Sequence, residues 1–439
     1  MSKHIDKLVE SKLKAIKQEK NIVEVGRVTT VNNYIIEVDG LWNVGYYEMV
    51  RIQNQAIGFV NRIRRDRVVV AIVKQLEKIN VGDEVVATGQ EFAGLYSKDS
   101  IGHIVNMFGQ DQLNNQVFDD THTVSTHVTP TPIMERSSVN RPMLTGITGI
   151  DMIYPIGRGQ RQLILGNKKT GKTQIALDTI VNQRGKDILC IYIAIGKTKK
   201  EVKEVYAQLY KRGAMDYTVI VTAFQDECAP VIQHTPFVGL SIAQEYMLKE
   251  NRDVLVVIDD LKKHADAYRE SSILTGEVPG RDAYPSDIFH THARLLEVGC
   301  QHKNGGSITI LPIMETKGGD ITDYISTNAI SITDGQLVLS TKNFEKGYRP
   351  AIDYGLSVSR LGGAVQTKEM KTIGAAVRRE LLAYLDSCQV YELSNPEEMS
   401  RELVERMEQG KQIRSQLKQY KFSPRTLEDM CSSFKEYAK

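Results

Sequence analysis

A stretch of eight residues in the first half of the chain has the composition and spacing of a phosphate-binding loop. Residues 166–173 read Gly-Asn-Lys-Lys-Thr-Gly-Lys-Thr and match the pattern G-x-x-x-x-G-K-[ST]. Glycines at both ends allow the backbone to curl, so that successive N–H groups point at one phosphate. We expect the Lys172 ammonium to reach the β- and γ-phosphates and the Thr173 hydroxyl to hold Mg²⁺. The pattern therefore indicates binding of ATP or ADP together with Mg²⁺.

A second candidate is an apolar run that ends in two carboxylates. Residues 253–260 read Asp-Val-Leu-Val-Val-Ile-Asp-Asp, which is typical of a buried strand followed by acid. In a nucleotide site, a carboxylate at the end of such a strand holds Mg²⁺, directly or through water. We expect Asp259 to complete the metal site, through water. The alternative is that Asp259 and Asp260 only cap the next helix.

The elements that must position these residues are visible on both sides of them. Residues 161–165 predict a buried strand that leads into the loop, and residues 174–183 predict a helix that leaves it. The N-terminus of that helix adds a partial positive charge. From residue 143 to about residue 368, apolar runs such as 188–195 alternate with helical patterns. This alternation predicts a parallel sheet with helices on both faces.

The rest of the chain has other sequence patterns. Short Val/Ile-rich runs separated by turns predict a small closed β-barrel over residues 23–89. The runs contain few aromatics and no basic stripe, which favours a structural collar over an oligonucleotide-binding barrel. Residues 1–20 have an apolar helical stripe, which is either a solvated face or a docking helix for a partner. Residues 372–439 predict helices, one of which begins near Asn395 and Pro396.

Composition excludes several classes of protein. The 439 residues are enough for two to four domains, and a net charge of +2 is too small for a nucleic-acid footprint. The five cysteines form no C-x-x-C motif, which favours a reducing compartment over a zinc ribbon or a disulfide framework. No run of about 18 apolar residues is present, so we expect membrane association only through partners. His122 and His127 could form a metal pair, but solvated loop histidines are the favoured interpretation.

Several motifs give the chain a specific likeness. Beside the phosphate loop and Asp259-Asp260-Leu261, they are residues 155–161, Lys263, Tyr268-Arg269, and residues 279–285, 332–336, 357–362 and 366–371. With these motifs in order, the chain resembles the α subunits of the F-type ATP synthase head. The resemblance implies a multidomain fold, with an N-terminal helix (1–22), a β-barrel collar (23–90), a central α/β RecA-like P-loop nucleotide-binding domain (91–370) and a shortened α-helical C-terminal domain (371–439).

The resemblance also implies an assembly and a set of site residues. Subunits of this type alternate with β-type catalytic subunits in a three-plus-three hexamer around a γ-type shaft, peripheral to the cytoplasmic side of the membrane. A peripheral-stalk or adaptor protein would bind the N-terminal helix, and no nucleic acid is expected as a partner. The nucleotide contacts carried over are Gly166, Asn167, Lys168, Lys169, Thr170, Gly171, Lys172, Thr173 and Gln174 in the loop, and Gln419 and Lys421 at the adenine.

Two residues bear on catalysis. Lys197 follows Ile195-Gly196, where the resemblance implies that a catalytic subunit has the Glu that activates water. A lysine ammonium accepts no proton at neutral pH unless its pKa falls by several units, so this chain's own site is expected to be non-catalytic. Lys197 could instead pair with a γ-phosphate. The resemblance makes Arg360 an arginine finger for the partner's site, and the alternative is an intrachain salt bridge.

Other departures from the family pattern keep alternatives open. Lys168 stands where Arg is usual, and Lys169 and Lys421 stand where Gln is usual. Lys169, Lys197 and Lys421 therefore add positive charge at three positions near the nucleotide. The chain could therefore belong to a paralogous F-type-like ATPase that drives motility or surface-protein machinery. A self-sufficient hexameric ATPase of the export or Rho type, and a nucleotide-gated scaffold without an ATPase partner, are the remaining hypotheses.

Overall fold

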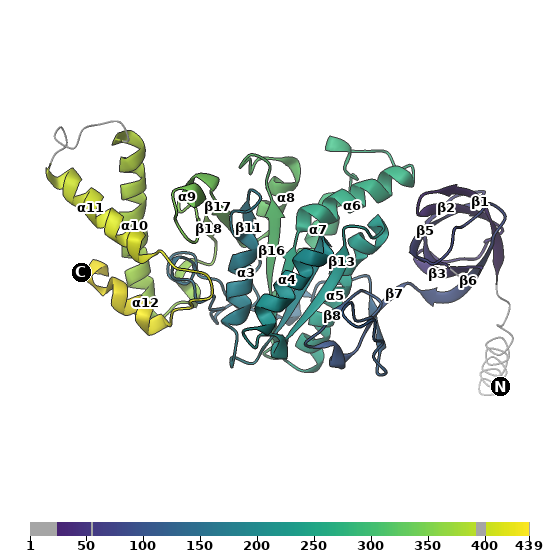
Figure 1. Cartoon of the computed structure of the whole chain (residues 1–439), viewed down its shortest axis with the longest axis horizontal. Helices are drawn as coiled ribbons and strands as arrows, with labels where there is room; N and C mark the ends of the chain where they lie inside the picture. Colours follow the sequence, from purple (N-terminus) through teal and green to yellow (C-terminus); the bar gives the residue numbers. More distant parts are fainter. Residues whose placement is uncertain (1–23, 54–55, 392–400, 439) are drawn as a thin grey trace, which may run out of the picture. The chain divides into compact units, whose positions relative to one another are not determined.

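The computed structural model describes residues 24–53, 56–391 and 401–438, which form two compact units. The first unit holds the described residues up to Ala93 with the short segments Cys228–Val231 and Glu270–Val278, and the second unit holds the remainder. The predicted leading helix and the predicted helix start at Asn395 lie outside the described residues. Figure 1 follows the chain from the purple barrel strands to the yellow C-terminal helices.

The first unit is a closed antiparallel barrel. Within the described residues, its strands follow the order β1-β2-β5-β4-β3-β6, and β1 pairs with β6 to close the ring. The side chains that fill the interior, among them Ile36, Val50 and Val70, are fully buried. Asn33 adopts a left-handed φ of 55° in the turn between the first two strands, which fits the turn chemistry expected there. The predicted small barrel is confirmed. Its strands are β1 (Val25–Asn32), β2 (Ile35–Asp39), β3 (Glu48–Ile52), β4 (Ala56–Ile63), β5 (Val68–Gln75) and β6 (Glu84–Glu91).

The second unit is built on a largely parallel sheet. Its strand order is β18-β17-β11-β16-β14-β12-β13-β8, and only the edge strand β18 runs antiparallel to its neighbour along this path. The phosphate-loop strand β11 lies between β17 and β16. The predicted parallel sheet is therefore confirmed. The strands are β8 (Ile104–Val105), β11 (Gln162–Gly166), β12 (Ile188–Lys197), β13 (Thr218–Phe224), β14 (Asp253–Asp259), β16 (Ser307–Glu315), β17 (Gly335–Leu339) and β18 (Val358–Ser359).

Helices cover both faces of this sheet, because alternate side chains of each strand point to opposite sides. Helices α3 (Lys172–Val181) and α4 (Lys199–Tyr210) share a core with Tyr192 and Ala194 of β12. Helix α5 (Ala229–Lys249) packs on the other face, where a Cβ on Gly239 would lie 2.5 Å from the side chain of Ile193. Further elements are α2 (Thr148–Asp151), α6 (Leu261–Leu274), α7 (Ile288–Leu296), α8 (Tyr324–Ile332), α9 (Thr341–Glu345), β7 (Ala93–Tyr96), β9 (His122–Ser125), β10 (Arg136–Ser137) and β15 (Cys300–His302).

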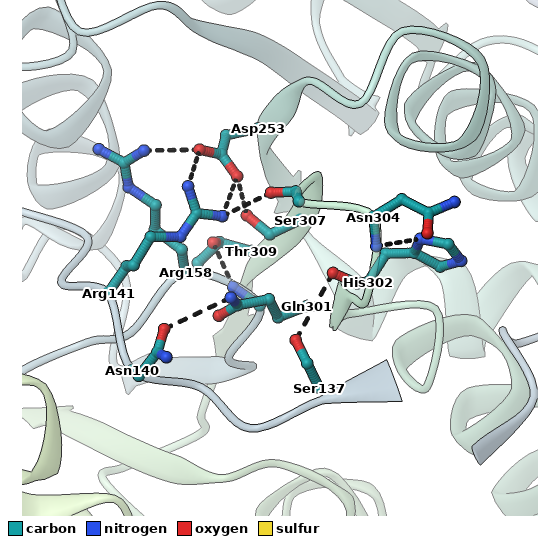
Figure 2. A network of polar contacts seen from close by, with 12 residues as sticks. Ser137, Asn140, Arg141, Arg158, Asp253, Gln301, His302, Asn304, Ser307 and Thr309 are labelled. Carbon is teal, nitrogen blue, oxygen red and sulfur yellow. Dashed lines mark hydrogen bonds and ion pairs between the residues drawn. The ribbon is translucent and has the colours of Figure 1, made fainter. Parts of the chain in front are cut away.

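The amino edge of the sheet is held by an ionic cluster. Figure 2 shows Arg141 and Arg158 converging on Asp253, the first residue of β14. Arg141 donates to both carboxylate oxygens at 2.8 and 2.9 Å, Arg158 donates to one of them at 2.5 Å, and Ser307 donates to the other at 2.6 Å. This cluster joins the starts of β14 and β16 to the segment that precedes β11.

The C-terminal helices complete the second unit. They are α10 (Lys368–Tyr391), α11 (Arg401–Gln416) and α12 (Leu427–Phe434), drawn in yellow and yellow-green in Figure 1. Val377 and Leu381 of α10 are fully buried. Gly410 lets α11 approach the ring of Tyr384, because a Cβ there would lie 2.2 Å from that ring. None of the described helices is long and apolar enough to cross a membrane.

One of the two histidines considered as a metal pair, His122, contacts a carboxylate. His122 Nε2 lies 2.8 Å from Glu245 Oε2, so this ring is bonded as well as partly exposed. Across the ranges that the structure describes, no group of three or more His, Cys, Asp or Glu side chains could hold a metal ion.

Candidate functional site

A cavity of about 670 Å³ opens beside the phosphate loop. It lies at the carboxyl ends of β11, β12, β14 and β16, the position at which parallel sheets bind ligands. Residues 145–147 and 419–424 form further parts of its wall. A volume of this size falls within the range of small-molecule and cofactor sites.

The phosphate loop has the backbone that anion binding requires. Gly171 adopts a left-handed φ of 101°, and a Cβ there would meet no atom within 4 Å. Helix α3 begins at Lys172, and no side chain caps its N-terminus. The first-turn N–H groups of a helix have no partner within the helix, so an anion can accept from them. Lys169 also lies in the left-handed region, at φ 64°, where a residue other than glycine is strained.

The side chains of the loop divide into two groups. Lys168, Lys169, Thr170, Gly171, Lys172, Thr173 and Gln174 line the cavity, whereas Gly166 and Asn167 do not. The Asn167 amide is held by Thr341, Thr316 and the Gly319 N–H, at 2.9, 3.0 and 2.6 Å. Lys172 Nζ donates to the carbonyls of Gly166 and Asn167 at 2.9 and 2.7 Å, and burial lowers the pKa of this lysine.

The predicted metal-binding pair, Thr173 and Asp259, does lie together. Asp259 Oδ2 accepts hydrogen bonds from the Thr173 hydroxyl at 2.8 Å and the Tyr192 hydroxyl at 2.7 Å. Its other oxygen, Oδ1, lies 2.8 Å from Lys197 Nζ. The sequence did not indicate this ion pair, because Lys197 was expected to meet a phosphate. Register explains it, since β12 and β14 are parallel neighbours with Ala194 opposite Asp259.

The charge of Lys197 follows from this contact. Burial lowers the pKa of Lys197, but the carboxylate of Asp259 outweighs burial and leaves that pKa above its ordinary value. Lys197 is therefore an ammonium at neutral pH and cannot accept a proton from water. The neighbouring Glu201 cannot take its place as it stands, because it accepts from the Thr198 N–H and hydroxyl at 2.8 and 2.7 Å and caps helix α4.

Two further carboxylates line the cavity, and sequence reasoning did not select them. Burial, and then the charge of Asp259, raise the pKa of Asp260 to about 7, while the Lys262 N–H donates to this carboxylate at 2.7 Å. Glu315 ends β16 and lies opposite Gly166 in the parallel register with β11. The rule that selected Asp259, a carboxylate at the end of an apolar strand, would have found Glu315 as well.

The two residues expected at the adenine have different environments. Lys421 and Gln419 both line the cavity. The Gln419 amide is fully engaged within the chain, because its oxygen accepts from Thr148 and its nitrogen donates to the carbonyls of Gly146 and Ser423. Gln419 therefore has no free amide proton for a base in this arrangement. It ties the 419–424 segment to the 146–148 turn.

Aromatic and cationic side chains complete the same wall. Phe422 lies under the Arg212 guanidinium at 3.3 Å from the ring centroid, and its N–H donates to Asp178 of α3 at 2.8 Å. Phe344 and Arg349 also line the cavity, with the guanidinium 3.5 Å from the ring centroid. No motif in the sequence singled out Arg212, Phe344 or Arg349, because they come from separate segments. The planar groups of Phe344, Arg349 and Phe422 line the cavity and suit a stacked nucleobase.

Arg360 lies outside the cavity, directly after the edge strand β18. Its side chain is exposed, and its guanidinium donates to the carbonyls of Ile330 and Ser331 at 3.2 and 3.5 Å. The nearby Asp334 carboxylate is bound instead by Arg161, at 2.7 Å. Within the described part of the chain, Arg360 forms no ion pair with a carboxylate, so the intrachain salt bridge considered for it is not present there.

Known proteins resemble this chain over most of its length. Residues 146–359 match the ATP synthase alpha/beta family, nucleotide-binding domain. The chain is 38% identical to the sodium ion specific ATP synthase subunit alpha of Acetobacterium woodii, over 97% of this chain and 84% of that protein. It is 38% identical to ATP synthase subunit alpha of Clostridium acetobutylicum over the same shares, and 42% identical to that of Lactobacillus delbrueckii subsp. bulgaricus over 87% of this chain and 76% of that protein.

Proposed function

Because the chain belongs to the family of ATP synthase α subunits, and so to an ATPase complex, we propose that it is the nucleotide-binding, non-catalytic subunit of a rotary head. Its role is to supply Arg360 to the catalytic site of a β-type partner. The partners are β-type subunits in an alternating three-plus-three ring and a γ-type shaft. The head is peripheral on the cytoplasmic side of a membrane, and a stalk or adaptor protein binds residues 1–22.

The observation that carries this proposal is the ion pair of Lys197 with Asp259 at 2.8 Å. Nucleotide hydrolysis needs a group that orients or activates water. At the end of β12 this chain has a charged ammonium bound to the strand β14 carboxylate. The nearest carboxylate along the sequence, Glu201, is engaged in the helix cap. A self-sufficient hexameric ATPase would need an acid at this place, which disfavours the export and Rho types.

The cavity supports binding of ATP or ADP without turnover. Uncapped N–H groups of α3 and the Lys172 ammonium supply the donors that a triphosphate chain requires. Phe344, Phe422 and the segment held by Gln419 form the wall for the base. In this proposal Gln419 positions the wall, and Lys421 contacts the nucleotide.

The residues expected to hold Mg²⁺ fit the ion only in part. Hydroxyl and carboxylate oxygens are suitable ligands for Mg²⁺, and Thr173 and Asp259 provide both. However, Lys197 already neutralises Asp259 Oδ1, and two hydroxyl groups donate to Oδ2. A metal bound directly to Asp259 Oδ1 would have to displace the ammonium. We therefore assign no step to Mg²⁺ in this chain's own site.

Arg360 supports the part of the proposal that concerns the partner. It is an exposed guanidinium at the end of an edge strand, and within the described chain only backbone carbonyls accept from it. A guanidinium placed on a transferring phosphoryl group in a neighbouring site stabilises the charge of the transition state, by about 10³–10⁵-fold in rate.

The test is reconstitution with the β-type subunit. The chain alone is expected to show no ATP turnover, and the mixture is expected to hydrolyse ATP. Arg360→Ala should lower turnover of the mixture about 10³-fold without preventing assembly. Arg379→Ala is the matched control, since Arg379 is also exposed and pairs with its neighbour Glu380. Robust turnover by the isolated chain, or full turnover by the Arg360→Ala ring, would contradict the proposal.

A further inference from the structure

The place where a divalent cation would meet Asp259 is taken by a side chain of the protein itself. Lys197 Nζ lies 2.8 Å from Asp259 Oδ1. Asp259 is only 1% exposed and is not part of the cavity wall, whereas Lys197 is part of it and 23% exposed. A cation that enters from the cavity therefore meets the ammonium before it meets the carboxylate.

The two oxygens of Asp259 have different partners. Thr173 and Tyr192 both donate to Oδ2, and the Lys197 ammonium lies against Oδ1. Mg²⁺ requires nearly ideal octahedral geometry and gives up water reluctantly. Two cations beside one buried carboxylate also repel each other strongly in a medium of low dielectric constant. The arrangement therefore favours the ammonium over the metal ion.

The rest of the cavity is also rich in positive charge. Among the described residues, six basic and four acidic side chains line it. The basic residues are Lys168, Lys169, Lys172, Lys197, Arg349 and Lys421. A lysine ammonium has three donors, and the contact with Asp259 uses one of those on Lys197. The other two are available to phosphate oxygens.

We infer that this cavity binds nucleoside di- and triphosphates as metal-free anions, with the Lys197 ammonium in the place of the divalent cation. This inference rests on the proposed function, because it presupposes a nucleotide beside the phosphate loop. It adds that occupancy of this site does not depend on Mg²⁺. If a partner site in the same ring requires the metal, nucleotide occupancy of the two sites would then depend differently on the concentration of Mg²⁺.

The first experiment is titration of the full chain with ATP by calorimetry, in EDTA and in excess Mg²⁺. The wild-type chain is expected to bind ATP in EDTA at least as tightly as in Mg²⁺. Lys197→Gln should weaken binding in EDTA by about ten-fold and make added Mg²⁺ strengthen binding, since one charge-assisted contact with phosphate is lost. Lys197→Arg keeps the charge and should retain binding in EDTA.

The control variant is Lys199→Gln. Lys199 lies two residues away, does not line the cavity, and pairs at 3.5 Å with the exposed Asp226. Its binding of ATP should match that of the wild type in both buffers. An equal loss in this variant would show that charge on the surface, and not the ammonium at Asp259, accounts for the effect, and would overturn the inference.

A second experiment measures the metal directly. The chain is loaded with ADP in the presence of Mn²⁺ and isolated by gel filtration, and both components are counted. The ratio of Mn²⁺ to ADP is expected to be near zero for the wild type and near one for Lys197→Gln. If Lys197→Gln does not fold, the ratio for the wild type still decides, because a value near one overturns the inference.

The outcomes separate this inference from the proposed function. Binding of ATP only in the presence of Mg²⁺ overturns the metal-free site and leaves the proposed function intact. Metal-free binding together with an Arg360→Ala ring of full activity overturns the finger and leaves this inference intact. Absence of nucleotide binding in both buffers overturns the inference and the nucleotide-binding part of the proposal.

Discussion

Strand β14 has a carboxylate at each end, and the two are held in different ways. At the amino end, Arg141, Arg158 and Ser307 donate to Asp253, as Figure 2 shows, and these contacts tie strands together. At the carboxyl end, Asp259 receives one ammonium and two hydroxyl groups beside a cavity of about 670 Å³. The first carboxylate bonds rigid guanidinium groups, while the second bonds side chains that a ligand can reach. The amino end of β14 therefore contributes stability, and its carboxyl end contributes binding.

The largest effect is expected from Asp253→Ala. The change leaves two guanidinium groups without their shared partner, which should lower the free energy of unfolding by about 4 kcal/mol. Nucleotide affinity should change little. Denaturant unfolding and calorimetric titration measure the two quantities. The control is Asp187→Asn. The Asp187 carboxylate is 92% exposed and pairs with Arg252 at 3.5 Å, and Asn tolerates the left-handed φ of 52° there, so the change should cost less than about 0.5 kcal/mol. Loss of nucleotide binding without loss of stability in Asp253→Ala would contradict the structural role of the amino end of β14.

A fall in pH is expected to lower stability through buried histidines on the carboxyl side of β14, and not through the arginines that bind Asp253. Helix α6, which follows Asp260, carries the buried His264, whose Nδ1 lies 3.2 Å from His292 Nε2. Burial, and then the charge of Lys262, lower the pKa of His292 to about 4. Burial and the neighbouring histidines also lower the pKa of His264.

A histidine whose folded pKa lies below its unfolded value of about 6.5 contributes stability that is present above pH 6.5 and is lost as pH falls toward 4. For His292 this loss amounts to about 3 kcal/mol. Unfolding at a series of pH values should show a shallower loss for His292→Gln than for the wild type. His290 is an exposed residue of helix α7, which also carries His292. His290→Gln should keep the wild-type slope. Identical slopes for all three proteins would show that the buried pair does not titrate on unfolding.

Lys172→Met should separate binding from stability in the opposite direction to Asp253→Ala. Lys172 contacts only the loop carbonyls of Gly166 and Asn167 in the described chain, and burial lowers its pKa. Its loss should weaken nucleotide binding by about 100-fold, because its ammonium is expected to reach two phosphates and each charge-assisted contact contributes about ten-fold. The free energy of unfolding should change by less than about 1 kcal/mol. Titration and unfolding of one preparation provide the measurement, and unchanged affinity would place the phosphates elsewhere.

The smallest effect is expected from Thr198→Ala, next to Lys197. Thr198 and Glu201 cap helix α4 reciprocally, and loss of such a cap costs about 1 kcal/mol. The change also removes one of the two hydrogen bonds that hold Glu201, while the N–H of residue 198 still donates to this carboxylate. Turnover by the isolated chain should remain absent, because Lys197 still stands at the end of β12. Turnover that appears in this variant would show that the cap, and not Lys197, keeps the site inactive.

Local patterns in the sequence were sufficient to predict the barrel, the parallel sheet, the phosphate loop and the pairing of Thr173 with Asp259. Each of these depends on local patterns, namely turn residues, strand-length apolar runs and a loop whose glycines and lysine stand at fixed spacing. Parallel strands bring their carboxyl ends to one edge, so residues at the ends of neighbouring strands meet whenever the sheet is correctly predicted.

Tertiary contacts were needed to identify the partners of Lys197, the hydrogen bonds of Gln419 and the aromatic wall of the cavity. Those contacts join segments that are far apart in the chain, such as Thr148 with Gln419 and Arg212 with Phe422. A side chain of a given type can bond to a ligand or to its own protein, and its spacing in the sequence is the same in both cases. The choice depends on the distances set by strand register and loop packing, which is why Lys197 reaches the carboxylate of Asp259.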